Sequence, residues 1–174
     1  LAVGAKVFLP SRREGVLKDA VGSLDAPGRA AWSVGDASLQ ADVVRVTAEA
    51  AAFMSGLDTI VVSAGAGGRT PILDTPPEEF RRIVDNSLLP VFLAARYGAQ
   101  HLIEAGAGAI IVVSSMYGLV GAKERVGYCG AKHGVIGMVK SIALDLADKG
   151  VRANCICPGF VETPLAYEVV RQEP

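Results

Sequence analysis

The sequence predicts an α/β fold in which helices pack on both faces of a parallel sheet, giving three layers in a doubly wound arrangement. Two observations carry this prediction. Short apolar runs alternate along the chain with longer segments of helical periodicity. Small or polar residues follow the apolar runs, as is common where parallel strands end and a ligand crevice forms.

Length and composition narrow the class of protein. The 174 residues are 51% apolar and 20% charged, enough for one domain with its own core and short for two, so we expect a single domain over residues 1–174. The 17 basic and 18 acidic residues are dispersed, which argues against a nucleic-acid surface. No apolar run reaches membrane-spanning length and no signal-peptide pattern opens the sequence, so we expect a cytoplasmic protein.

The cysteines predict neither a disulfide framework nor a metal site. Cys129, Cys155 and Cys157 are odd in number, and they lack zinc-ligand spacing with the two histidines. This usage fits a reducing compartment.

The first part of the chain predicts three strands and two helices. A helix tail ends at Gly4, strands follow at 7–9, 30–34 and 57–63, and helices at 13–24 and 38–55. Ser38 is the expected N-cap of the second helix, because its hydroxyl can accept a hydrogen bond from a free backbone N–H. A loop of small residues follows the third strand.

The second part of the chain continues the alternation. A long helix opens near Glu78, with a kink expected at Pro90, and a fully apolar strand covers 110–113. Another helix opens near Gly127, and a strand covers 151–157 before Pro158-Gly159. Residues 160–174 read as loop or a short helix.

The segment from Ile110 to Lys132 contains the residues best suited to chemistry. Ser114 and Ser115 follow a buried strand, and Tyr128 and Lys132 lie four residues apart on one helical face. A lysine ammonium about 4 Å from a tyrosine could lower the tyrosine pKa by the roughly 3 units that acid–base work near pH 7 requires. The Tyr-x-x-x-Lys pattern also occurs by chance on helix surfaces, so the pair needs support from other blocks.

Four blocks in order supply that support. They are GAKVFLPSRRE, LDTIVVSAG, the VVSS and YCGAK pair, and VRANCICPGFVETP. Together, and with the spacing from Ser115 to Tyr128, they resemble the short-chain dehydrogenase/reductases from the first residue to about Leu165. The resemblance implies a Rossmann fold that binds NAD or NADP and transfers hydride between nicotinamide and a carbonyl or alcohol.

The resemblance also implies a role for each matching residue. Tyr128 corresponds to the general acid/base, Ser115 to the hydroxyl that orients the carbonyl, and Lys132 to the group that lowers the tyrosine pKa and binds the nicotinamide ribose. Asp36 and Ala37 correspond to the adenine site. The remaining cofactor positions are Ser63, Ala64 and Gly65 near the ribose, and Pro158, Gly159 and Thr163 at the nicotinamide. Residues 160–174 correspond to the start of a substrate-binding lid.

The residues after the strand at 7–9 favour NADP(H) over NAD(H). Enzymes that use NAD often place an acidic residue there, where it repels a 2′-phosphate. This chain has Ser11, Arg12 and Arg13, and arginine offers a permanently charged fork that suits a phosphate. The alternative is that both arginines simply begin a solvated helix.

Three departures from the family pattern stand out. The first family strand and its Gly-rich loop are not in the sequence, which should leave two neighbouring strands unpaired, and we expect the parent protein to contain them. Val62 and Ser63 replace two asparagines. Ser87 aligns with the asparagine that helps hold a water on the path from the lysine to solvent, while Asn86 lies one position earlier.

The sequence therefore leaves two functional hypotheses. The first is an oxidoreductase acting on a small-molecule carbonyl or alcohol. The second is a catalytically weak or inactive family member that serves as a structural subunit or nucleotide sensor, suggested by the changes at Val62, Ser63 and Ser87. In either case the resemblance implies a homodimer or homotetramer formed by the helices that contain Phe92 and Val135.

Overall fold

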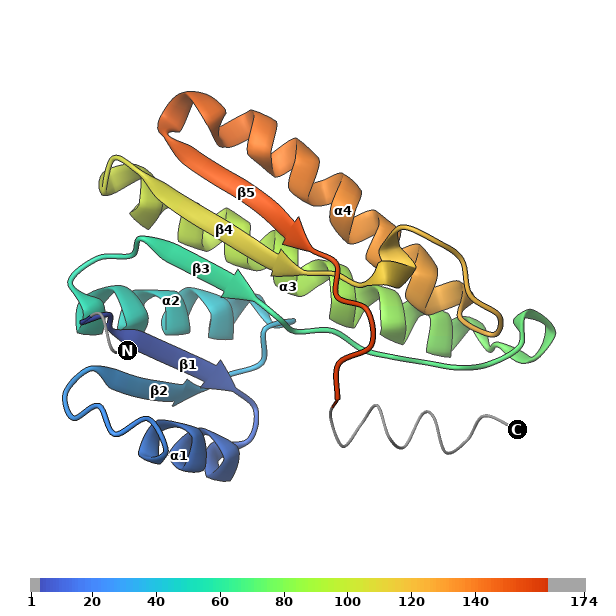
Figure 1. Ribbon diagram of the computed structural model, residues 1–174, viewed down its shortest axis with the longest axis horizontal. Helices are drawn as coiled ribbons and strands as arrows, with labels where there is room; N and C mark the ends of the chain where they lie inside the picture. Colours follow the sequence, from blue (N-terminus) through green and yellow to red (C-terminus); the bar gives the residue numbers. More distant parts are fainter. Residues whose placement is uncertain (1–3, 163–174) are drawn as a thin grey trace.

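The computed structural model describes residues 4–162 (Figure 1). Its strands are β1 (Val7–Ser11), β2 (Ala30–Val34), β3 (Thr59–Val62), β4 (Gly108–Val113) and β5 (Val151–Ile156). The α-helices are α1 (Glu14–Gly22), α2 (Gln40–Met54), α3 (Pro77–Glu104) and α4 (Val126–Leu146), with short 3₁₀ helices η1 (Ile72–Asp74), η2 (Met116–Gly118) and η3 (Ala147–Lys149). The predicted alternation of strands and helices is confirmed.

The strands pair in parallel but form two sheets. β1 pairs with β2, and β4 lies between β3 and β5, with Ile110 opposite both Ile60 and Ala153. β1 and β3 are neighbours in Figure 1, yet within residues 4–162 no ladder joins them. This is the pair of unpaired edges that the sequence predicts on either side of the first family strand.

The helices place the apolar core on one face of β3, β4 and β5. α3 packs against those three strands, and α2 and α4 pack on either side of it, while α1 contacts β1 and β2. Buried side chains alternate along the strands, as Ile110 and Val112 in β4 and Val151 and Ala153 in β5 show. On the other face, Val61 and Ile156 are exposed. The period of two matches a sheet covered on one face within the described residues.

The N-cap prediction for Ser38 is wrong. α2 begins at Gln40 after Leu39, and no side chain caps it. The backbone N–H and hydroxyl of Ser38 instead donate to Oδ1 of Asp36, at 2.9 and 2.7 Å. The Asp36 carboxylate, two residues earlier, is a strong charged acceptor. The Ser38 hydroxyl therefore donates to it and closes the turn before the helix instead of capping the helix.

α3 is the longest element and continues through Pro90 as one helix. Pro76 and Pro77 mark its start, where a missing N–H costs nothing, and Glu78 and Glu79 complement the helix dipole.

No helix in residues 4–162 combines the length and apolarity that crossing a bilayer requires.

Substitution of Leu102 measures how much the apolar core contributes to the free energy of unfolding. Its side chain is 0% exposed in α3, whereas Leu144 in α4 is 80% exposed. We expect Leu102→Ala to lower the free energy of unfolding by about 2–5 kcal/mol because it removes buried carbon and leaves a cavity. Leu144→Ala should change it by less than about 1 kcal/mol. Urea unfolding of both variants measures this, and equal effects would contradict the described packing.

Candidate active site

Lys132 connects α4 to the end of β4. Its side chain is 5% exposed, and Nζ donates to the Val113 carbonyl at 3.0 Å. In return the hydroxyl of Ser114, the residue after the strand, donates to the Lys132 carbonyl at 3.0 Å. The two bonds hold this turn of the helix against the carboxyl end of the strand, where the sequence predicts chemistry.

Burial perturbs this lysine. Loss of hydration lowers the pKa of Lys132 from its ordinary value of 10.5, and the nearby thiols of Cys155 and Cys157 act in the opposite direction. Within residues 4–162 the Lys132 ammonium has one carbonyl acceptor, which compensates a buried charge poorly. It therefore favours further acceptors or negative charge beside Nζ.

Tyr128 lies one turn earlier on the same face. Lys132 Nζ is 5.8 Å from the centre of the Tyr128 ring, and the Tyr117 ring meets the same ring edge-on at 6.3 Å. The predicted convergence of the tyrosine and lysine is thus present. Tyr117 packs the tyrosine from the side of η2.

The loop after β4 brings Ser115 to the same region. Ser115 is 8% exposed, and its Oγ accepts a hydrogen bond from the Tyr117 N–H at 3.2 Å. The next residue, Met116, donates its N–H to the Pro158 carbonyl at 2.8 Å. The Pro158-Gly159 turn after β5 therefore lies beside the serine loop, as the family resemblance implies.

Gly118 is needed for this close packing. A Cβ at that position would lie 2.7 Å from Ser114 Oγ and 2.8 Å from the Lys132 carbonyl oxygen. Backbone cannot move aside as a side chain can, so a larger residue would separate the loop from α4. The sequence patterns did not single out this glycine.

Gly65 and Ser87 complete the site from the side of β3 and α3. A Cβ on Gly65 would lie 3.4 Å from Lys132 Nζ and 4.0 Å from Ser87 Oγ. Ser87 is 1% exposed, and its hydroxyl has no hydrogen-bond partner among the described residues. Asn86 turns back on its own helix, donating to the Arg82 carbonyl at 2.8 Å. Ser87 rather than Asn86 therefore faces the lysine.

The other departure has a packing explanation. Val62 is 6% exposed and belongs to the apolar core. Ser63 is exposed, Ala64 is half-buried, and both follow β3 on the way to Gly65. Thr163 lies outside the described residues.

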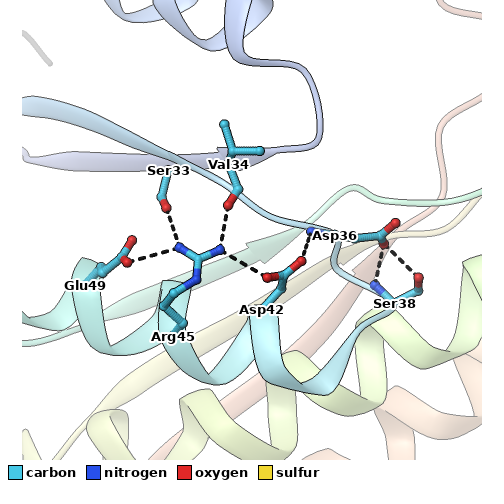
Figure 2. Close-up of polar contacts among 7 residues, drawn as sticks. All are labelled: Ser33, Val34, Asp36, Ser38, Asp42, Arg45 and Glu49. Atoms are coloured by element: carbon cyan, nitrogen blue, oxygen red, sulfur yellow. Dashed lines mark hydrogen bonds and ion pairs between the residues drawn. The ribbon is translucent and has the colours of Figure 1, made fainter.

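A second group of predicted residues gathers where β1 and β2 end. The Gly35 N–H donates to the Ser11 carbonyl at 3.0 Å, and the Arg13 N–H donates to Ser11 Oγ at 3.4 Å. Arg12 lies 3.7 Å from Oδ2 of Asp36. Ser38 holds the pKa of Asp36 below its ordinary value through its hydroxyl and backbone N–H (Figure 2). Ala37 lies between these two residues in the same turn.

Sequence reasoning missed one connection near the site. Glu124 accepts a 2.8 Å hydrogen bond from Arg69 Nε, and its carbonyl accepts one from the Thr70 N–H at 2.8 Å. These two contacts join the loop after β3 to the loop before α4. We refer to them together as the Arg69–Glu124 pair. Glu124 adopts a left-handed backbone, φ 61°, that side chains disfavour. No sequence motif marks it.

The two groups suit the two ends of a dinucleotide. Acceptors and cations at the ends of β1 and β2 fit an adenine ribose, and Gly65 offers backbone that a ligand can approach closely. Lys132 and the unpartnered Ser87 hydroxyl offer polar partners at the opposite end. The residues present therefore fit a nicotinamide dinucleotide.

Comparison with known proteins decides the family. The family model described as short chain dehydrogenase matches residues 1–174. The chain belongs to the short-chain dehydrogenase/reductase family. The residue blocks in the sequence had suggested the same assignment.

Relatives within the family are dehydrogenases. Cis-4-hydroxycyclohexanecarboxylate dehydrogenase of Sinomonas cyclohexanicum is 34% identical over 93% of this chain and 66% of its own length. A Xanthobacter autotrophicus protein named inactive 2-(S)-hydroxypropyl-CoM dehydrogenase 2 is 31% identical over 98% of this chain and 74% of its own length. The chain thus spans just under two thirds of the length of the first relative.

A solved structure shows the same fold. Sorbitol-6-phosphate 2-dehydrogenase SrlD of Erwinia amylovora superposes with a TM-score of 0.93 at 27% identity, covering 98% of this chain and 69% of that one. The Rossmann-like α/β architecture expected from the sequence is confirmed.

Two buried serines provide a matched test of the site. Ser114 Oγ has a hydrogen-bond partner, whereas Ser87 Oγ has none among the described residues. We expect Ser114→Ala to lower the free energy of unfolding by about 0.5–1.5 kcal/mol, and Ser87→Ala to leave it unchanged or raise it by about 1–3 kcal/mol. Denaturant titration measures both. Equal destabilisation would mean that a bound water or another group satisfies Ser87.

Proposed function

We propose that the protein is an NADP(H)-preferring oxidoreductase that interconverts an alcohol and a carbonyl on a small-molecule substrate. One observation carries the proposal. The polar or charged side chains buried in residues 4–162 are Ser87, Ser114, Ser115 and Lys132, and their contacts gather them around one end of the sheet beside Tyr128. Burying polar groups is costly, so their concentration at one place favours a chemical role over a structural one.

In the proposed mechanism, Tyr128 is the general acid/base. During reduction its hydroxyl gives a proton to the substrate oxygen, and during oxidation it takes that proton back. The Ser115 hydroxyl donates to the same oxygen and holds it against the tyrosine. The Lys132 ammonium stabilises negative charge that develops on the tyrosine oxygen, and it also binds the ribose next to the nicotinamide. The bound nicotinamide supplies or accepts the hydride.

Cofactor binding involves both ends of the sheet. We assign the 2′-phosphate to Ser11, Arg12 and Arg13, and the adenine to Asp36 and Ala37. Ser63, Ala64 and Gly65 let the ribose pass close to backbone. Pro158 and Gly159 shape the nicotinamide pocket. Thr163, assigned to the same pocket, and all but the first three residues of the proposed lid at 160–174 lie outside the described residues.

Ser87 is the proposed partner for proton exchange. Its hydroxyl and Lys132 Nζ face Gly65 from two helices, with distances of 4.0 and 3.4 Å to a Cβ built there. A hydroxyl in this position can pass a proton on, as can the water that the family asparagine helps to hold. The change from asparagine therefore leaves the relay possible with a shorter side chain.

Assembly and location follow the family expectation. Phe92 and Leu89 on α3 are exposed at 50% and 39%. We propose that α3 and α4 form the interface of a homodimer or homotetramer in the cytoplasm. Single exposed apolar residues are common on monomers, so solution mass decides this point.

Tyr128→Phe separates an enzyme from a nucleotide sensor. We expect the variant to keep its fold and cofactor affinity but to lose at least about 100-fold in kcat on a panel of carbonyl substrates, because no proton donor remains. Tyr97→Phe, a change on α3, should keep full activity. Wild-type binding of cofactor without turnover on any substrate would favour the catalytically inactive alternative, and one relative is itself named inactive.

Arg12→Gln tests the cofactor preference. The Arg12 side chain is 71% exposed and close to Asp36, so its charge is available to a phosphate at little desolvation cost. We expect the variant to bind NADPH about 10- to 100-fold more weakly, which corresponds to one charged hydrogen bond, with NADH affinity unchanged. Arg81→Gln on α3 serves as the control in fluorescence titrations. Equal affinity of the wild type for both cofactors would contradict the preference.

A further inference from the structure

Arg45 occupies the centre of a polar cluster between β2 and α2 (Figure 2). Its Nη1 donates to Ser33 Oγ at 2.8 Å and to Glu49 Oε1 at 3.0 Å. Its Nη2 donates to the Val34 carbonyl at 2.6 Å and to Asp42 Oδ1 at 3.1 Å. One guanidinium therefore ties the end of the strand to two carboxylates of the helix.

The cluster reaches the adenine site through Asp42. While Oδ1 of Asp42 accepts from Arg45, its Oδ2 accepts the Asp36 N–H at 2.9 Å. The Asp36 carboxylate is oriented in turn by Ser38, whose N–H and hydroxyl both donate to Oδ1. A continuous chain of hydrogen bonds thus runs from Arg45 to the backbone of the residue assigned to adenine.

The backbone between strand and helix has little freedom to move. A Cβ at Gly35 would lie 2.9 Å from Val46 Cγ2 and 3.4 Å from Arg45 Nη2. The Arg45 hydrogen bond also lowers the pKa of Asp42, after the larger effect of the Asp36 N–H. Without the guanidinium, Asp42 and Glu49 would lose their shared cation, and Asp42 would face the Asp36 carboxylate uncompensated.

We propose that Arg45 is a positioning residue that sets the discrimination of this site for adenine. The proposal rests on the function above, which assigns the adenine to Asp36, and it adds that the Asp36 carboxylate accepts a hydrogen bond from the 6-amino group. A carboxylate accepts but does not donate, so a base with an oxygen at position 6 is repelled. Such discrimination depends on holding the carboxylate in place, because a mobile carboxylate can turn away from the wrong base.

The test compares two nucleotides on the full-length protein. NADPH and its hypoxanthine analogue, which has an oxygen in place of the 6-amino group and a hydrogen on N1, are titrated against wild type, Arg45→Met and Arg45→Lys. Arg81→Met is the matched control, since Arg81 on α3 is paired with Glu78 three residues earlier, at 3.8 Å, as Arg45 is paired with Asp42. Thermal unfolding without nucleotide reports on the fold of each variant.

We expect the wild type to bind NADPH at least about tenfold more tightly than the analogue, as a site built around one hydrogen bond should. Arg45→Met should bring this ratio to within about twofold of one, Arg45→Lys should lie between, and Arg81→Met should keep the wild-type ratio. If Arg45→Met does not fold, the intermediate ratio of Arg45→Lys supports the proposal, and an unchanged ratio in that variant contradicts it.

Other outcomes overturn the inference in distinguishable ways. An Arg45→Met protein that binds both nucleotides more weakly by the same factor has lost only structural support, and the positioning role is then wrong. A wild-type ratio near one means that Asp36 does not read the base, which overturns the inference and leaves oxidoreductase activity untouched. A wild type that binds neither nucleotide refutes the proposed function itself.

Discussion

The buried side chain of Lys132 is the constraint on which the packing at the carboxyl end of β4 depends. A charge that is 5% exposed needs acceptors, and the Val113 carbonyl supplies one where β4 ends. That bond sets the height of α4 above the sheet, and the reciprocal bond from Ser114 fixes its rotation. Tyr128, one turn away, packs against the Tyr117 ring, and the Tyr117 N–H donates to Ser115 Oγ. Gly118 permits the contact because a side chain there would meet the Lys132 backbone.

Much of the fold could be predicted because strong patterns act locally. The strand at 30–34 was correct at both ends, and fully apolar β4 was recognisable without its partners. The Ser38 cap failed because a nearby carboxylate competes for the same hydroxyl, and propensity does not weigh that competition. The exposed face of β5 was likewise invisible, since burial depends on which elements cover a strand.

The site divides in the same way. Tyr128 and Lys132 could be paired from spacing alone because a helix enforces that face. Asn86 and Ser87 could not be distinguished, since one residue is a rotation of 100° on a helix and Pro90 obscures the alignment. The structure turns Ser87 inward and Asn86 back to Arg82. The Arg45 cluster lay beyond sequence reasoning, because it needs β2 and α2 side by side.

The Arg69–Glu124 pair has a consequence for how the loops after β3 and before α4 are organised. Glu124 accepts an unfavourable left-handed backbone in order to join two loops, so the strain is incurred during folding and not when a substrate arrives. Because Arg69 lowers the pKa of Glu124, the connection stays charged at neutral pH and into the acid range. Loops that are already ordered lose little entropy on binding. The backbone strain at Glu124 thus lowers the stability of the fold, and in return the loop before α4 is already ordered.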